Sequence, residues 1–477
     1  MTARLHVDVA VIGAGPGGLA AARAAAEGGA RVVCLDLFAA AGGQYHMQPT
    51  QPESRFAQTP QVLSGRDAAR AARSAGVEIL TRTEVFWVAG TEDGGYCLSA
   101  CQAGAEALSI RATTLVVASG AMERPLPFPG WTLPGVIGAG AAQRLLKTGT
   151  GALPVPGKAV LAGSGPFLMA VAQTFAKAGQ PLAHFVEYRR PNPRATARLL
   201  ARHLRKLAEA FGLLRDLRRS GAERHFGHIV TRALGKDRLE AVEIAPIDAS
   251  GRPDPARVQR IEGVGTLAIG YGFQPVTDVT AALGADHGFD PALGGWHCIV
   301  DPATGASSRP GLYAAGEVSG IGGASPARLS GRIAGSHAAA AALGRAAPDA
   351  AIVAPLAAEL AAARGFARGL AALYPPLPDL PLDLAPDEVL CRCEDVTLAE
   401  VRAAVADGAR ETFAVKMWTR AGMGPCQGRI CGAAIAAELR RAGTRPEAAG
   451  FNRPHLPLRP TPLPVVRAAL AAERGST

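Results

Sequence analysis

One stretch near the start of the chain decides the fold: Val7-Asp8-Val9-Ala10-Val11-Ile12-Gly13-Ala14-Gly15-Pro16-Gly17-Gly18. A Val- and Ile-rich run of strand length leads directly into a glycine-rich turn, and the Ala-rich segment that continues to about Glu27 predicts a helix. Each glycine of this G-x-G-x-x-G pattern has a physical task. Gly13 permits the tight turn, Gly15 lets backbone amides approach a pyrophosphate, and Gly18 lets the helix pack closely on the strand. The stretch therefore predicts a dinucleotide site at a helix N-terminus.

Later segments complete this first site. Asp36 ends the next expected strand, where its carboxylate can accept a hydrogen bond from a ribose hydroxyl. The segments Leu115–Ala121 and Gly311–Glu317 resemble the parts of flavoproteins that run beside the cofactor, and Gly42–Gln44 resembles flavoproteins of the same class. These features favour FAD over another adenine dinucleotide, which stays open as the alternative. The further residues assigned to the site are Asp36, Gly43, Gln44, Ser119, Gly120, Gly316 and Glu317.

A second strand, glycine turn and helix follow about 150 residues later. Gly163-Ser164-Gly165-Pro166 repeats the first turn, and Glu187 closes the next expected strand. Leu168 stands where the third glycine belongs, which weakens the close approach of helix and strand. Glu187 suits an unphosphorylated ribose, whereas Arg189 and Arg190 can attract a 2′-phosphate. We expect NAD(P) or another adenine nucleotide here, and the alternative is a nucleotide fold without a tightly bound ligand.

Four of the eight cysteines form the pattern C-x-C-x32-C-x4-C: Cys391, Cys393, Cys426 and Cys431. A reducing cytoplasm disfavours disulfides among them. Structural zinc usually takes C-x2–4-C pairs at both ends, which a C-x-C pair fits poorly. Two sulfide-bridged irons held by four thiolates fit better, so we predict a 2Fe–2S cluster, with zinc or no metal as alternatives. Lys416, Arg420 and Arg429 stand nearby in the sequence and can offset the negative charge of the cluster.

The order of elements divides the chain into parts. Alternating strands and helices predict an α/β flavoprotein with two Rossmann-like dinucleotide-binding domains on parallel sheets, and a small C-terminal α-helical 2Fe–2S domain. The expected parts are a discontinuous flavin-binding domain (1–155 and 266–345), a second nucleotide-binding domain (156–265), a linker (346–386), the cluster domain (387–443) and a Pro-rich tail (444–477).

Composition and charge exclude several other classes. The 477 residues are 48% hydrophobic and 19% charged, which is typical of a globular protein with two or three domains. The net charge of +10 comes from scattered arginines rather than from a basic patch, so we expect no nucleic-acid partner. No stretch approaches ~20 uncharged apolar residues, and no signal-peptide pattern opens the chain, so we expect no transmembrane segment. The predicted location is the cytoplasm, or the inner face of a membrane through a complex.

Motifs of other chemistries are missing from the sequence. There is no C-x-x-C redox pair, no H-E-x-x-H, no G-x-S-x-G and no revealing carboxylate pair, so no catalytic residue is assigned. His225 and His228 stand three apart in an expected turn. Because no further ligands accompany them, we favour a surface role over a metal site for this pair.

Four further segments carry a family resemblance: Met122–Trp131, Leu133–Val136, Gly270–Phe273 and Thr419–Arg429. Over nearly its whole length the chain resembles the alpha subunits of heteromeric amino-acid and opine dehydrogenases. Opine oxidase, D-hydroxyproline and proline dehydrogenases and hydrogen cyanide synthase belong to this group. The cysteine region resembles the 2Fe–2S domain of the bacterioferritin-associated ferredoxin type.

The resemblance implies a division of labour. An amino-acid-oxidase-like partner subunit with its own FAD oxidises a C–N bond of an amino acid, imino acid or opine. This chain then passes the electrons to a respiratory or other acceptor, as part of an oxidoreductase that acts on CH–NH or CH–NH2 donors. The resemblance adds two further candidates, FMN at a subunit interface and a small ferredoxin-like subunit. Two alternatives stay open: a stand-alone NAD(P)H-dependent flavoprotein reductase that feeds its own cluster, and a non-catalytic iron–sulfur protein that responds to redox changes.

Overall fold

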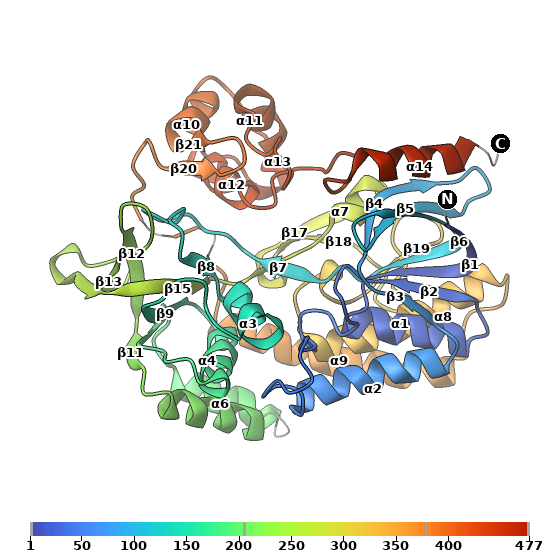
Figure 1. The fold of residues 1–477 in the computed structure, drawn as a ribbon, viewed down its shortest axis with the longest axis horizontal. Coiled ribbons are helices and arrows are strands. Elements are labelled where there is room, and N and C mark those ends of the chain that lie inside the picture. Colours follow the sequence, from blue (N-terminus) through green and yellow to red (C-terminus); the bar gives the residue numbers. More distant parts are fainter. Residues whose placement is uncertain (1–2, 150, 204–206, 378, 381, 475–477) are drawn as a thin grey trace.

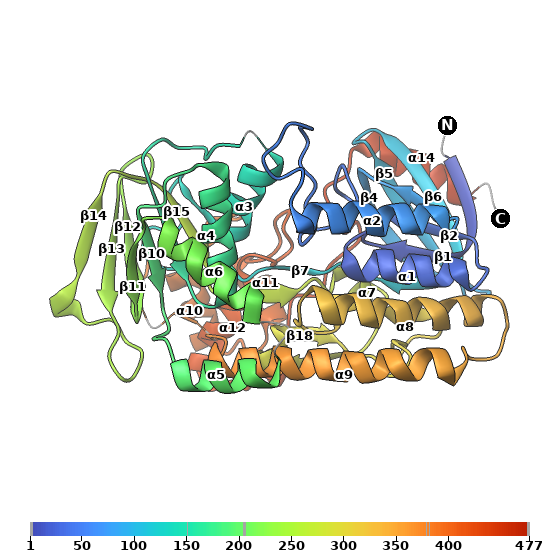
Figure 2. The same cartoon turned by 90° about the horizontal axis from the view of Figure 1, so that it is seen from below.

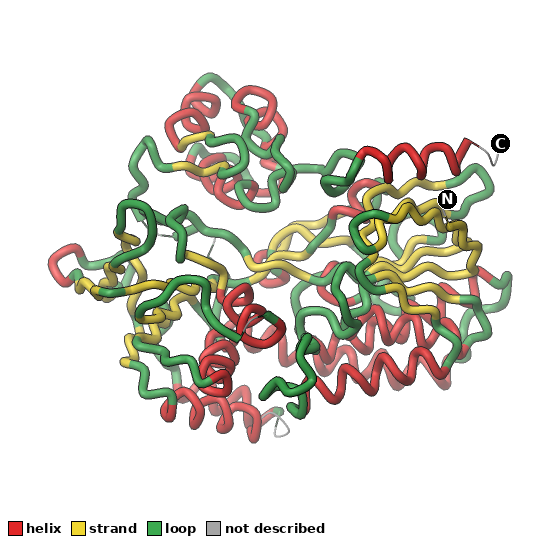
Figure 3. Tube along the Cα trace, viewed as in Figure 1, coloured by secondary structure: helices red, strands yellow, loops and turns green. Residues whose placement is uncertain are grey.

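The computed structural model describes residues 3–149, 151–203, 207–377, 379–380 and 382–474. Figure 1 shows two α/β units side by side and a small helical domain on one side of them. Loops connect this helical domain to the rest of the chain at both of its ends (Figure 3). Both ends of the chain lie on the first unit (Figure 1).

A seven-stranded sheet forms the first unit. Its strands are β1 (Ala3–Ile12), β2 (Val32–Leu35), β3 (Glu78–Leu80), β4 (Thr83–Gly90), β5 (Tyr96–Gln102), β6 (Glu106–Val117) and β19 (Leu312–Ala314). The order is β3-β2-β1-β6-β5-β4, with β19 paired to β6. β1 runs parallel to β2 and to β6, so the carboxyl ends of these strands meet at one edge of the sheet.

Three helices cover one face of this sheet: α1 (Pro16–Glu27), α2 (Pro60–Ser74) and α8 (Ala324–Ala342), as Figure 2 shows. α1 and α8 touch at backbone distance. A Cβ atom added to Gly331 would lie 2.1 Å from the carbonyl oxygen of Gly17, and one added to Gly335 would lie 2.1 Å from that of Ala21. The many alanines and glycines of both helices therefore form a thin, dense layer of the core.

The second unit has a five-stranded parallel sheet in the order β11-β10-β9-β15-β8. Its strands are β8 (Val136–Gly138), β9 (Lys158–Gly163), β10 (His184–Glu187), β11 (Glu223–Phe226) and β15 (Val264–Gly270). The predicted pair of α/β units built on parallel strands is confirmed, and the first sheet adds an antiparallel part in which β5 pairs with β4 and β6. The expected boundary at residues 155 and 266 is misplaced, because β8 and the whole of β15 belong to this second sheet, although β8 and residues 266–270 of β15 were assigned to the first domain.

Four helices and a small sheet surround the second unit. The helices are α3 (Ala139–Thr148), α4 (Pro166–Ala178), α5 (Pro193–Arg202) and α6 (Leu207–Arg219). The antiparallel sheet contains β12 (His228–Leu234), β13 (Ala241–Pro246) and β14 (Gln259–Glu262), with a 3-10 turn at Pro255–Arg257. Short elements lie between the units. They include the antiparallel pair β7 (Ala121–Glu123) and β16 (Phe273–Pro275) and the hairpin β17 (His287–Asp290) and β18 (Gly295–Cys298). The short helix α7 (Asp278–Ala282) and 3-10 turns at Pro291–Leu293 and Gly316–Ser319 complete this region.

The segment expected as a linker is mostly helical. α9 (Ala350–Leu373) runs along α8 and reaches α5 in Figure 2. Leu356 and Leu360 on α9 are buried against Leu329 and Ile333 on α8. Among the described residues α9 is the one helix long and apolar enough to cross a membrane by length and composition, which alone is weak evidence for a span.

The cysteine-bearing domain is small and mostly helical, as predicted. It contains β20 (Val389–Cys391), β21 (Val396–Thr397), α10 (Leu398–Ala406), α11 (Thr412–Thr419), α12 (Gly432–Arg441) and α13 (Pro446–Ala449). α10 begins with a capping box, because Thr397 and Glu400 satisfy each other's backbone amides. The expected Pro-rich tail ends in α14 (Leu463–Arg474), whose Val465 and Ala469 pack on Phe86 of the first sheet.

Candidate redox cofactor sites

The first glycine turn has the geometry that a dinucleotide requires. Gly13 has φ +100°, and a Cβ there would lie 2.3 Å from the carbonyl oxygen of Ala118. A Cβ on Gly18 would lie 1.6 Å from the carbonyl oxygen of Gly13, so the helix rests directly on the turn. Gly15 is different, because its Cβ would meet nothing closer than Gly43 Cα at 3.9 Å. No side chain caps α1, which leaves its first N–H groups open to a phosphate.

Asp36 and Gly43 border this turn. The Asp36 carboxylate accepts hydrogen bonds from the backbone N–H of Ala14 at 2.6 Å and of Phe38 at 2.8 Å. Burial raises the pKa of Asp36 above its usual value, and the two N–H donors oppose that rise. Gly43 lies against Gly15, and Gln44 beside it is exposed. The structure thus shows that hydrogen bonds to Asp36 stabilise the turn. A contact between Asp36 and a ribose stays a proposal.

The remaining residues predicted for the first site also lie at this edge of the sheet. The Ser119 hydroxyl donates to the carbonyl oxygen of Val276 at 2.6 Å, which ties the strand end to the junction between the units. Gly316 lies beside Gly17, at the N-terminus of α1. Glu317 accepts a hydrogen bond from the N–H of Gly323 at 3.0 Å, and burial raises the pKa of its carboxyl group.

The second glycine turn shares the link to an acidic residue but differs in backbone geometry. Gly165, at the position of Gly15, has φ +108° where Gly15 has φ −75°. Its N–H donates to Glu187 at 3.0 Å, whereas in the first turn the donor to Asp36 is Ala14, one position earlier. Burial raises the pKa of Glu187 to about 7, against two backbone donors. Leu168, at the third glycine position, is fully buried, and Gly270 on the neighbouring strand makes room for it. Leu168 was expected to weaken the close approach of helix and strand. Gly270, which is not part of the motif, compensates by leaving space for its side chain.

A cavity of about 290 Å³ lies at this second turn. It is lined by Gly165 and Glu317, by Phe366 of α9 and by Tyr374 directly after that helix. The two arginines suggested for a 2′-phosphate are engaged elsewhere. Arg189 donates to the carbonyl oxygen of Pro375 at 2.8 Å, and Arg190 donates to that of Ile247 at 3.2 Å. These contacts favour an unphosphorylated nucleotide at this turn.

The four predicted cluster ligands come together as two pairs of thiols. A hydrogen bond from the Cys431 thiol lowers the pKa of Cys391 to about 6 and raises that of Cys431. Cys393 contacts Cys426 in the same way, and burial raises its pKa. Among the described residues, the one trio of ligating side chains close enough to share a single ion lies elsewhere, in the second unit. This arrangement in two pairs fits a cluster of two irons, each bound by two thiolates, better than it fits a single ion bound by four thiolates.

The surroundings of the thiols suit a negatively charged cluster. The N–H of Gly422 points at Cys391 Sγ at 3.5 Å. Lys416 is 5% exposed, and burial lowers the pKa of this lysine, whereas a thiolate at Cys431 favours its charged form. Arg420, at φ +68°, pairs with Glu394 at 3.0 Å and so joins the two cysteine loops.

The cluster domain is fastened to both nucleotide-binding units. Arg429 pairs with Asp278 at 2.8 Å, with side chains only 12% and 17% exposed, and its other nitrogens donate to backbone carbonyls of Cys426 and Leu458. On the opposite side, Trp131 Nε1 donates to the carbonyl oxygen of Val389 at 2.8 Å. Buried charge pairing together with side chain to backbone hydrogen bonds holds the cysteines beside the flavoprotein body.

A cavity of about 400 Å³ lies at this junction. Trp296 and Phe451 line it, together with Arg124, Arg440 and Asn452. Asn452 lies against Gly428 in the cysteine loop, and neither polar atom of its buried amide has a protein hydrogen-bond partner. An unpartnered amide at the rim of the loop fits a cluster or ligand that supplies the missing bonds.

Sequence reasoning missed several of these residues. Arg364 on α9 lines a cavity of about 240 Å³ beside Glu317, and Asn452 stands in the expected tail. No motif marks either residue, because each reaches its site from an element that is distant in the sequence. Three cysteines outside the cluster domain, Cys34, Cys101 and Cys298, are buried and form no disulfide.

Comparisons with known proteins agree with this geometry. Residues 7–342 match the family model of the pyridine nucleotide-disulphide oxidoreductases, and residues 389–441 match that of the BFD-like [2Fe-2S] binding domain. The predicted FAD-dependent oxidoreductase fold and the predicted 2Fe–2S cluster are thereby confirmed, and the glycine turn and thiol pairs described above fit both groups.

Individual relatives match over almost the whole chain. An opine oxidase subunit of Agrobacterium tumefaciens (strain Ach5) is 34% identical over 471 residues, which cover 96% of this chain and 90% of the relative. Hydrogen cyanide synthase subunit HcnB of Pseudomonas aeruginosa is 33% identical over 468 residues, covering 96% and 98%. The fold of L-proline dehydrogenase from P. horikoshii superposes with a TM-score of 0.67 at 19% identity, covering 98% of this chain and 80% of that chain. The chain is therefore an oxidoreductase that belongs to the pyridine nucleotide-disulphide oxidoreductase family and carries a C-terminal BFD-like [2Fe-2S] domain.

Proposed function

We propose that this chain is the electron-transferring subunit of a heteromeric dehydrogenase that oxidises an amino acid, imino acid or opine at a C–N bond. The observation that carries the proposal is the placement of the thiol pairs against the flavoprotein body, where Arg429 and Trp131 hold them. Cofactors that exchange electrons need such fixed proximity. FAD, when bound, takes up two electrons, and a 2Fe–2S cluster passes them on singly.

The names of the relatives support a partner subunit. Two of them are called subunits, of opine oxidase and of hydrogen cyanide synthase. We propose that substrate oxidation takes place on an amino-acid-oxidase-like partner with its own FAD, and that a small ferredoxin-like subunit can join the complex. A respiratory or other acceptor receives the electrons, in the cytoplasm or at the inner face of a membrane.

Within this chain the proposed roles follow from the geometry. Gly13, Gly15 and the open N-terminus of α1 bind the pyrophosphate of FAD, and Asp36 and Glu317 accept hydrogen bonds from its hydroxyl groups. The cavity beside Asn452 is the proposed place for a second flavin such as FMN, since aromatic and arginine side chains line it. The second glycine turn binds an adenine nucleotide.

The cavity at the second turn favours one competing function, a stand-alone NAD(P)H-dependent reductase. In that case a nicotinamide nucleotide would enter beside Gly165 and reduce the flavin directly. Phe366 and Tyr374 occupy part of the wall of this cavity, and Arg189 is bonded to the carbonyl oxygen of Pro375, so we rank this function second.

The experiment uses the chain purified with its partner under anaerobic conditions. A panel of proline, hydroxyproline, sarcosine and opines is mixed with the complex, and flavin bleaching and acceptor reduction are followed separately. In a Cys431→Ser complex we expect flavin bleaching to persist and acceptor reduction to fail. Cys97→Ser, outside the cluster domain, is the control and should behave as wild type. Acceptor reduction at the wild-type rate in Cys431→Ser would refute the proposed route.

A further inference from the structure

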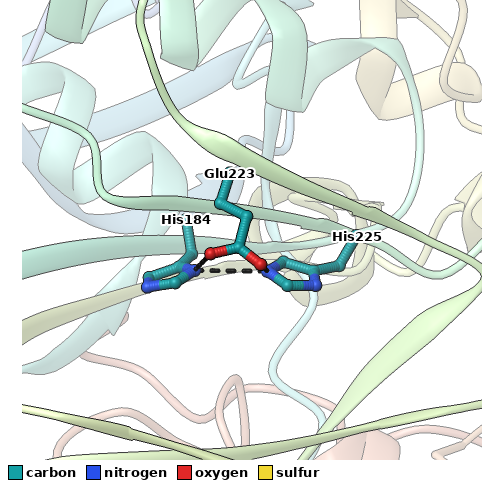
Figure 4. A group of neighbouring side chains, drawn as sticks. All are labelled: His184, Glu223 and His225. Carbon is teal, nitrogen blue, oxygen red and sulfur yellow. Dashed lines mark hydrogen bonds and ion pairs between the residues drawn. The ribbon is translucent and has the colours of Figure 1, made fainter.

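Three metal-ligating side chains meet at the amino-terminal edge of the second sheet. His184 begins β10 and Glu223 begins β11, and the two residues are partners in the parallel register. His225 lies two residues further along β11, on the same face as Glu223. Figure 4 shows both imidazoles and the carboxylate turned toward one another. The predicted surface role of His225 is wrong, because its side chain is only 8% exposed. The sequence did not reveal the trio, because His184 lies about 40 residues before Glu223 and His225 and only strand pairing joins them.

The distances between the donor atoms resemble those of a metal site. His184 Nδ1 lies 3.2 Å from His225 Nε2, and each carboxylate oxygen of Glu223 lies 3.5 Å from one of these nitrogens. In a tetrahedral zinc site with bonds of about 2.0–2.2 Å, neighbouring ligand atoms lie roughly 3.3–3.6 Å apart. The three measured separations fall at or very close to that range.

We propose that His184, Glu223 and His225 bind a divalent transition-metal ion, and that this ion is zinc. Two imidazoles and one carboxylate form a ligand set that zinc uses with a fourth position open to water. Imidazole ligands select against magnesium and calcium, which prefer sites made of oxygen alone. Glu223 is 66% exposed, so the open position faces solvent and an ion can enter.

The neighbouring groups define the limits of the site. Lys158 lies near His184 and opposes a cation, and the carboxylate of Glu223 offsets that charge. The ring of His228 lies beside that of His225, but His228 Nδ1 is bonded to the carbonyl oxygen of Phe226 at 3.1 Å. His228 is therefore a neighbour of the trio rather than a ligand.

The site is separate from the nucleotide sites. Glu187 ends β10 at the second glycine turn, three residues beyond His184, which places it about 10 Å away at the opposite edge of the sheet. A metal at His184 and Glu223 therefore does not contact a nucleotide. It joins β11, the edge strand, to β10 and fixes that border of the second unit.

The test uses the full chain with its cluster intact, treated with EDTA and then desalted under anaerobic conditions. Zinc sulfate is titrated in by calorimetry, with iron content measured before and after. We expect wild type to bind one zinc ion per chain without loss of iron. His184→Gln and Glu223→Gln should each weaken this binding by roughly a hundredfold or more, and His228→Gln should bind zinc as wild type does. Circular dichroism and flavin content establish that the variants are folded.

X-ray absorption at the zinc edge gives a second, independent result. The zinc-loaded wild type should show nitrogen and oxygen ligands at about 2.0–2.2 Å and no sulfur at about 2.3 Å. Failure of wild type to bind zinc, equal binding by all four proteins, loss of binding in His228→Gln, or a sulfur shell would each overturn the proposal.

Discussion

Two glycines of the first turn should respond differently to the same substitution. A Cβ at Gly18 would lie 1.6 Å from the carbonyl oxygen of Gly13, so α1 must move by roughly 2 Å before the contact becomes ordinary. Such overpacking costs about 1–3 kcal/mol even without a ligand. Gly15 has φ −75° and ψ −173°, which any residue adopts, and its Cβ would meet only Gly43 at 3.9 Å. Gly15→Ala should therefore leave the protein without FAD undisturbed, within about 0.5 kcal/mol.

The contrast appears when FAD binds. The new methyl group of Gly15→Ala occupies the space through which backbone amides approach the pyrophosphate. We expect it to weaken FAD binding by about 10- to 100-fold, which corresponds to about 1.4–2.8 kcal/mol. Gly18→Ala should lower both the stability of the FAD-free protein and the FAD affinity, because the whole helix N-terminus is displaced.

The assay measures thermal unfolding of FAD-free chains and FAD affinity by fluorescence titration. Gly18→Ala should lower the unfolding temperature of the FAD-free chain by several degrees, and Gly15→Ala should not change it. An equal loss of FAD-free stability in both variants would refute the packing argument. Wild-type FAD affinity in Gly15→Ala would refute the assignment of this turn to the pyrophosphate.

Three other substitutions test the cluster domain and a buried acid. Lys416→Met removes a buried cation beside Cys431, so the cluster potential should fall by on the order of 50–100 mV in a redox titration followed by electron paramagnetic resonance; an unchanged or higher potential contradicts this. Arg429→Met breaks its pair with Asp278 and should weaken the attachment of the cluster domain by about 2 kcal/mol, since Arg459 still contacts that carboxylate. Faster limited proteolysis ahead of residue 387 reports the loss, and an unchanged rate counts against it. Burial raises the pKa of Glu123 from 4.5 to about 7, so the stability that this group gives is complete below pH 4.5 and is lost as the pH rises toward 7. In urea unfolding, wild type should therefore lose a few kcal/mol relative to Glu123→Gln between these pH values, and parallel pH profiles would contradict the assignment.

Local patterns were sufficient where one short segment carries the whole signal. The turn from Gly13 to Gly18 lies between its strand and its helix in the sequence, and Asp36 follows in the next strand, so spacing alone predicted their meeting. The four cluster cysteines were found in the same way. A small separation in sequence and a strict chemical demand on each position make such sites readable.

Tertiary packing decided the rest. The three-residue strand β8 is too short to show a pattern, so the border between the two units was misplaced. α9 is Ala-rich and contains Pro355, and only contact with α8 shows that this segment is part of the body rather than a linker. The cavity beside Asn452 and the trio around His225 combine elements far apart in the chain, which single-sequence periodicity does not reveal.

The most direct test of the account is the visible spectrum of the full chain, purified anaerobically with its flavin and about two irons, first with NADH and then with the partner protein and its substrate. We predict that NADH alone leaves the flavin and cluster absorption unchanged, and that the partner with its substrate bleaches both. Prompt bleaching by NADH in the absence of the partner would contradict the account and identify the chain as a reductase in its own right.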